Sequence, residues 1–159
     1  MASRTTRRKV LLWLNHLDLR PGDPSVTTSF DWIQTHGLVV NSSTTGDTAP
    51  GGGNKVVATG IEVPPGWLVT GVRVCYQLSN SRTHIDQIRL AQTQRPPGTQ
   101  LVILDDPTAH SAQGPVCVDS RPTSVDPAHG AIMLSLRLAF GDTGDAITIL
   151  ALGVHLTSA

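Results

Sequence analysis

The stretch Ile61–Leu78, IEVPPGWLVTGVRVCYQL, decides the fold class of this chain. Its Pro-Pro-Gly turn at residues 64–66 separates a short strand from a longer one, because proline and glycine favour tight turns. In the longer strand every second side chain is apolar and faces the same way, namely Val72, Val74, Tyr76 and Leu78. The pattern predicts a sheet with one buried face.

The composition extends this prediction to the whole chain. Its 159 residues suit a single domain, and because only 4% are aromatic, the core must be built mainly from aliphatic side chains. Turn-forming residues, among them 15 Gly and 11 Pro, separate about eight to ten short strands, and no segment has a convincing helical pattern. Strands without helical crossovers must pair antiparallel, so we expect an all-β antiparallel sandwich of the jelly-roll or Greek-key type.

The N-terminal residues differ from the rest. Residues 1–9 hold four of the 12 basic residues, Arg4, Arg7, Arg8 and Lys9. We expect a disordered basic tail over residues 1–9 and one β-sandwich domain over residues 10–159. The apolar run Val10–Leu14 is too short for a secretory signal and is predicted to be the first strand.

The C-terminal strands suggest self-assembly. The segments 132–140 and 146–156 flank the turn GDTGD and are predicted to pair as a hairpin. Both carry apolar or small residues on the two faces, which requires cover from another layer. With no helix to supply it, our main hypothesis is a non-enzymatic structural or binding module that forms a homo-oligomer through these faces.

Charge and hydropathy restrict the partners. The 12 basic and 12 acidic residues cancel, which argues against a nucleic acid partner. No window of about 18 apolar residues exists, so we expect a soluble protein without membrane insertion.

The two cysteines leave the cellular compartment of the protein undecided. Cys75 and Cys117 are either two free thiols or one disulfide that joins two strands across the sandwich. Cys75 alternates with the apolar face of its strand and therefore belongs to the outer side, where a disulfide or an interface is favoured. A disulfide would indicate an oxidising compartment, such as the outside of the cell.

The pattern around the Pro-Pro-Gly turn also resembles a known group of proteins. From Ile61 to Tyr76 it follows apolar-x-Val-Pro-Pro-Gly-x-x-Val-Thr-Gly-Val-x-Val-x-Tyr, which is similar to the central hairpin of small uncharacterised bacterial proteins with a jelly-roll-like β-sandwich. The resemblance implies a stand-alone or exported domain of that fold. It assigns no catalytic residue.

Carbohydrate binding is the alternative function. No G-x-S-x-G motif or other catalytic pattern is present, so we do not expect an enzyme. Glycan sites combine an aromatic plane with hydrogen-bonding side chains. The candidates are Trp67 as the plane and Arg73 and Gln77 as polar partners, with Trp32 as a second aromatic; Trp67 as a plug at one end of the sandwich is the competing interpretation.

A metal site is the third hypothesis. Asp106 with His110, and Asp126 with His129, occur in two similar Asp-Pro turns. Carboxylate and imidazole groups are ordinary ligands of divalent ions, although Asp-Pro is first of all a turn former. We expect no cofactor, and a divalent ion held by these four residues is the alternative.

Overall fold

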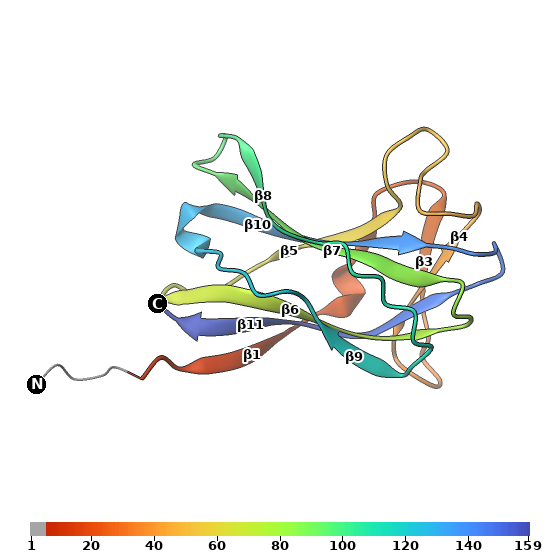
Figure 1. The fold of residues 1–159 in the computed structure, drawn as a ribbon, viewed down its shortest axis with the longest axis horizontal. Coiled ribbons are helices and arrows are strands. Elements are labelled where there is room, and N and C mark those ends of the chain that lie inside the picture. Colours follow the sequence, from red (N-terminus) through yellow and green to blue (C-terminus); the bar gives the residue numbers. More distant parts are fainter. Residues whose placement is uncertain (1–5) are drawn as a thin grey trace, which may run out of the picture.

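The computed structural model describes residues 6–159 and consists of two antiparallel β-sheets packed face to face (Figure 1). Sheet A contains β1 (Lys9–Leu14), β3 (Val26–Phe30), β4 (Leu38–Ser42), β6 (Trp67–Leu78), β9 (Val116–Asp119) and β11 (Ile147–Ser158). Sheet B contains β2 (Arg20–Pro21), β5 (Val56–Ile61), β7 (His84–Gln94), β8 (Gln100–Asp106) and β10 (Gly130–Ala139). The structure also contains two short 3₁₀ helices, η1 (His16–Asp18) and η2 (Pro127–His129). The predicted all-β sandwich is confirmed.

The ends of the chain refine the expected boundaries. Residues 1–5, and Arg4 with them, lie outside the described residues. β1 begins at Lys9, and the backbone of Arg8 exchanges hydrogen bonds with Ser158 at the end of β11. In the described part of the chain, no helix is long and apolar enough to cross a membrane.

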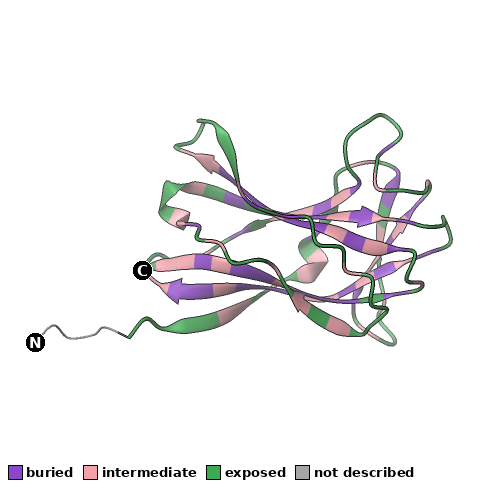
Figure 2. Cartoon of the chain, in the orientation of Figure 1, coloured by how far each residue is buried: buried purple, intermediate pink, exposed green. Residues whose placement is uncertain are grey.

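The strand order is β3–β4–β11–β6–β9 in sheet A and β2–β5–β10–β7–β8 in sheet B. β1 and β4 pair with the same edge of β11: β4 with residues 147–149 and β1 with residues 152–157. The apolar residues predicted for the inner face of β6 are buried in the core between the sheets: Val72, Val74, Tyr76 and Leu78 (Figure 2).

The predicted C-terminal hairpin is wrong. β10 lies in sheet B between β5 and β7, whereas β11 lies in sheet A between β6 and the edge shared by β4 and β1. The turn at residues 141–146 therefore carries the chain from one sheet to the other. It is fixed by Asp145, which accepts hydrogen bonds from Arg82 and from the Thr83 hydroxyl. The apolar faces of the two strands meet across the core, because alternation specifies the buried face of a strand and not its neighbour.

The apolar residues on both faces of β11 have an internal explanation. The register of β11 against β6 shifts between Ile149 and Ala151, which is a bulge. Ile147 and Ile149 before the bulge and Leu152 and Val154 after it are all buried in the core. A bulge adds one residue and so reverses the alternation. This pattern in β11 is therefore no evidence for a subunit interface.

The long Ser/Thr/Gly-rich connection between β4 and β5 is held by a buried lysine. The Lys55 ammonium donates hydrogen bonds to the carbonyl oxygens of Thr44 at 2.6 Å, Thr45 at 2.8 Å and Gly46 at 3.2 Å. Because a buried ammonium needs such partners, the loop is fixed around this side chain.

Candidate functional site

A groove of about 660 Å³ crosses the outer face of sheet A. Its walls are β1 on one side and the end of β9 with residues 120–123 on the other, and β6 and β11 form its floor. The floor is low because Gly71 of β6, which lies opposite His155 of β11, has no side chain. We call this feature the sheet A groove.

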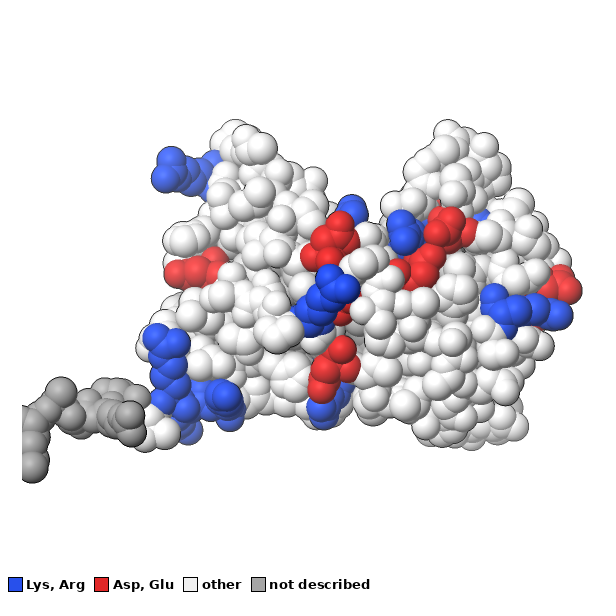
Figure 3. Space-filling model, in the orientation of Figure 1, with Lys and Arg blue, Asp and Glu red and all other residues white. Residues whose placement is uncertain are grey.

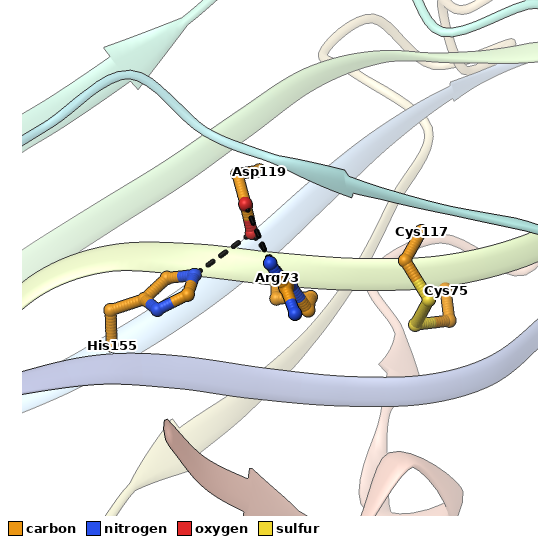
Figure 4. The surroundings of a disulfide bond; sticks show 5 residues. All are labelled: Arg73, Cys75, Cys117, Asp119 and His155. Carbon is orange, nitrogen blue, oxygen red and sulfur yellow. Dashed lines mark hydrogen bonds and ion pairs between the residues drawn. A yellow bond between two sulfur atoms is a disulfide. The ribbon is translucent and has the colours of Figure 1, made fainter. Parts of the chain in front are cut away.

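The polar centre of the groove is the carboxylate of Asp119, shown in Figure 4. Arg73 lies opposite Asp119 in the register of β6 and β9 and donates from Nε and Nη2 to its two oxygens, both at 2.8 Å. His155 Nε2, from β11, lies 2.8 Å from Oδ1 of the same carboxylate. Three strands thus meet in one cluster of charged and polar groups.

These hydrogen bonds fix the charge of the cluster. The Arg73 guanidinium holds the pKa of the Asp119 carboxyl well below its usual range, and the His155 hydrogen bond lowers it further. The carboxylate is therefore ionised at any physiological pH and acts only as an acceptor. Its side chain is 46% exposed, so it can still accept hydrogen bonds from a ligand in the groove.

An exposed indole lies beside the groove, two strands from Arg73. It lines a separate pocket of about 380 Å³ together with Leu14 and Gly60. Trp13 of β1 is 53% exposed and lies opposite Gly153 of β11, which in turn lies opposite Arg73. A Cβ atom added to Gly153 would lie 3.1 Å from Leu11 Cδ1 and 3.1 Å from Trp13 Cε3. The Leu11 and Trp13 side chains therefore lean over the glycine on the outer face of the sheet.

The strand pattern explains why β1 presents an aromatic outward. Leu12 and Leu14 pack against the core cluster, so the alternate residues Leu11 and Trp13 must point to the outside. The two apolar faces of β1 thus have different roles, one in the core and one on the surface.

A disulfide fastens the wall that carries Asp119. Cys75 of β6 and Cys117 of β9 are bonded to each other on the outer face of sheet A (Figure 4). The bond joins two neighbouring strands of one sheet and not the two sheets. β9 is an edge strand with a short pairing to β6, so the disulfide holds the groove wall in register.

The structure separates the three residues predicted for glycan binding. Arg73 and Gln77 share the outer face of β6, where Gln77 is exposed beyond the disulfide. Trp67 is half-buried and packs against the core, which agrees with the competing interpretation as a plug. Of the three, only Arg73 belongs to the cluster around Asp119.

The four residues of the metal hypothesis do not come together. Residues 6–159 contain no group of three or more His, Cys, Asp or Glu side chains placed to hold a metal ion. Asp106 is buried and accepts hydrogen bonds from Thr108 and from the backbone N–H of Arg121. Asp126 and His129 form a separate pair at 3.9 Å. A metal site at these residues remains a prediction that this arrangement does not favour.

Trp32, the second predicted aromatic, is 66% exposed in the turn between β3 and β4. Its ring contacts Phe30 and His36 edge-on, at centroid distances of 5.7 Å and 6.5 Å. The turn is ordered by Asp31, whose carboxylate accepts three backbone N–H groups and one hydroxyl. This aromatic is well presented, but no groove accompanies it among the pockets that the structure shows.

Trp13, Asp119 and His155 were not predicted from the sequence as members of this cluster. One signal could have found Asp119: if Cys75 and Cys117 pair directly in antiparallel strands, the residues two places outward, Arg73 and Asp119, also face each other. Trp13 could have been found from the alternation within Val10–Leu14. No sequence signal places His155 beside them, because β11 is distant in sequence from β9.

No model of a known protein family matches the sequence, and no curated protein matches it either. The fold, however, is shared with solved carbohydrate-binding modules. The xylan-binding CBM22-1 domain of Xyn10C from Paenibacillus barcinonensis matches with a TM-score of 0.57 and 11% identity, over 94% of each chain. A CBM36 module in complex with calcium and xylotriose matches with a TM-score of 0.51 and 12% identity, over 92% of this chain and 98% of that one. The C-terminal family 22 module of Clostridium thermocellum Xyn10B matches with a TM-score of 0.50 and 14% identity, over 89% and 86%. At these identities the likeness concerns the fold alone.

Proposed function

We propose that this chain is a non-catalytic carbohydrate-binding module and that the sheet A groove is its ligand site. The observation that carries the proposal is the exposed Trp13 indole beside the groove, separated from Arg73 of the Asp119 cluster by the side-chain-free Gly153. A sugar ring offers an apolar face and a rim of hydroxyls, so it needs an aromatic plane with hydrogen-bonding groups at its edge. The solved xylan-binding and xylotriose-binding modules of the same fold support this proposal.

Each group has a role in the proposed complex. Trp13 stacks on a sugar ring, and the free lone pairs of Asp119 accept hydrogen bonds from its hydroxyls. Arg73 uses Nε and Nη2 on Asp119, so its remaining N–H groups are directed to the ligand or to water. His155 stabilises the carboxylate from the other side.

The disulfide supports a place for this module outside the cytosol. Disulfides persist in oxidising compartments and are rare where glutathione keeps thiols reduced. We therefore propose that the protein acts after export, where polysaccharides are accessible.

Calorimetric titration with xylotriose and with soluble xylan tests the proposal. Trp13→Ala should weaken binding by about 2 kcal/mol, roughly thirtyfold, because a central aromatic anchor is lost. The matched control is Trp32→Ala, which removes an indole of similar exposure away from the groove and should leave the affinity unchanged. Retained binding in Trp13→Ala with loss in Trp32→Ala would move the site to the turn between β3 and β4.

Self-assembly is the second candidate function. Its supporting observation is an aliphatic strip on the outer face of sheet B, where Met133 and Val102 are exposed on either side of Ala91. We propose this strip as the interface of any homo-oligomer. Light scattering of the wild type and of Met133→Lys tests it, since a charge in the strip should dissociate such an oligomer and a monomeric wild type would contradict it.

A further inference from the structure

The basic N-terminal segment lies at one end of the sheet A groove. Lys9 lines the groove and lies opposite Thr157 in the register of β1 and β11. Arg8 is held next to it, because its N–H donates to the Ser158 hydroxyl at 3.0 Å and its carbonyl accepts from the Ser158 N–H at 2.9 Å. Arg7 precedes them, and all three basic side chains are exposed. Figure 3 shows Lys and Arg side chains gathered at this N-terminal corner of the surface.

The charge of this segment is not neutralised by the protein. Within residues 6–159, none of the acidic side chains forms an ion pair with Arg7, Arg8 or Lys9. Most of the other arginines of the described chain do have an aspartate partner: Arg73, Arg82, Arg89, Arg121 and Arg137. Since the charges of the whole chain cancel, these unpaired basic side chains give this end of the groove a local positive potential.

We propose that the preferred ligand of the sheet A groove is an anionic polysaccharide, one that carries carboxylate or sulfate groups along a sugar backbone. This inference rests on the proposed function and specifies its ligand class. A sugar unit stacks on Trp13, its hydroxyls meet Asp119, and an acidic group of a neighbouring unit binds Lys9 and Arg8.

The Asp119 carboxylate favours a polysaccharide over a nucleic acid. It is ionised and half-exposed in the middle of the groove. A nucleic acid carries a phosphate on every residue and would bring one of them against this carboxylate. A uronic acid unit carries its carboxylate and its free hydroxyls on different edges of the sugar ring. The hydroxyls of such a polysaccharide can therefore face Asp119 while a carboxylate of a neighbouring unit faces Lys9 and Arg8.

The test compares an anionic and a neutral ligand in wild-type protein and in two double variants. Polygalacturonate and xylan are titrated at 50 and 300 mM NaCl, as experimental settings on either side of physiological salt. Arg8→Gln with Lys9→Gln removes two charges at the groove, and Arg20→Gln with Arg95→Gln removes two exposed, unpaired charges elsewhere as the matched control. Thermal unfolding checks that both double variants fold.

We expect the Arg8/Lys9 variant to bind polygalacturonate about tenfold more weakly than the wild type and to lose about one to two units of the salt slope, because each cation that pairs with a polyanion contributes about one. Its xylan affinity and both affinities of the control variant should stay within about twofold of the wild type. Equal loss in the two double variants, or equal affinity of wild type for both ligands at low salt, would overturn the inference.

Two further outcomes separate this inference from the proposed function. Tighter binding of single-stranded RNA than of polygalacturonate would replace the polysaccharide by a nucleic acid as the ligand. If xylan binds and depends on Trp13 while polygalacturonate does not bind, the module is confirmed and only the anionic preference is lost. If neither polysaccharide binds, the proposed function itself fails.

Discussion

The outer faces of the two sheets are built by the same alternation of side chains and yet carry different chemistry. On sheet B, long charged side chains span neighbouring strands and pair with one another. Arg137 bonds Asp86 at 2.7 Å, and Asp105 accepts hydrogen bonds from both Gln87 and Arg89. On sheet A, glycines keep the surface low between β1 and β9, and Trp13 and Asp119 remain open to a ligand.

Under the proposed function, the difference means that charge alone does not make a site on this fold. The ion pairs of sheet B use the carboxylates of Asp86 and Asp105 on neighbouring protein side chains, so these acceptors are already engaged. On sheet A the Arg73–Asp119 pair is equally satisfied, but it borders an aromatic plane and a hollow. We therefore expect perturbations of sheet A to change binding and equivalent perturbations of sheet B to leave it intact.

Removal of the disulfide should have the largest effect. The two cysteines are 42 residues apart in the sequence, and their bond closes the loop between them. The double substitution Cys75→Ser with Cys117→Ser opens this loop and should lower the free energy of unfolding by about 2 to 4 kcal/mol. It should also release β9 and weaken glycan binding, because Asp119 then loses its fixed position. Urea unfolding and calorimetry measure the two effects. Unchanged binding in the folded double variant would show that β6 alone positions β9.

A methyl group at Gly153 should have the next largest effect. In Gly153→Ala the new Cβ would lie 3.1 Å from Leu11 and Trp13 atoms and push the indole out of place. We expect a loss of about 1 kcal/mol in binding, roughly fivefold, from this overpacking. The matched control is Gly51→Ala in the connection between β4 and β5, where a Cβ meets nothing within 4 Å. It should leave binding unchanged and raise stability by up to about 1 kcal/mol, because alanine restricts the unfolded chain. Equal binding losses in both variants would contradict the role of Gly153 in placing the indole.

The smallest expected effect concerns the protonation of two aspartates, one on each outer face. Burial and the neighbouring Asp47 carboxyl raise the pKa of Asp86 on sheet B, whereas Arg73 lowers the pKa of Asp119 on sheet A. Asp86 therefore favours the folded state when protonated and loses that contribution as the pH rises through its folded pKa. Asp119 contributes above the unfolded pKa of about 3.9 and loses its contribution only as the pH falls through its depressed folded pKa.

A carbon-13 NMR titration of the carboxyl groups checks this order. Asp86 should titrate above an ordinary aspartate and Asp119 below it, and the glycan affinity should not follow the Asp86 titration. A fall in affinity that follows the Asp86 titration would place the ligand on sheet B instead.

Much of the fold could be predicted from the sequence, and little of the site. The inner face of β6 followed from period-two alternation, because each buried side chain is specified locally. The partner of β10 did not, since pairing with β7 rather than β11 depends on contacts between distant segments. The bulge at Ile149 and Ala151 made β11 look apolar on both faces, which led to the hypothesis of a subunit interface.

The candidate site shows the same limit. Arg73 was selected for its own chemistry, but Trp67 was placed with it although the two point to opposite faces of sheet A. Trp13 and His155 are brought to Arg73 only because β1 and β6 flank β11. Neighbouring strands lie about 5 Å apart, so residues on three strands form one surface whatever their distance in sequence.

The sequence by itself therefore determined the all-β class, the buried face of the long strand and the outward position of Cys75, because alternation and turn chemistry act over a few residues. Only the tertiary structure decided which strands are neighbours. That choice joins Cys75 to Cys117, sets Asp119 opposite Arg73 and places Trp13 across Gly153 from Arg73. The physical reason is that strand order follows from burying all apolar faces at once, a condition on the whole chain, and the candidate site is a product of that order.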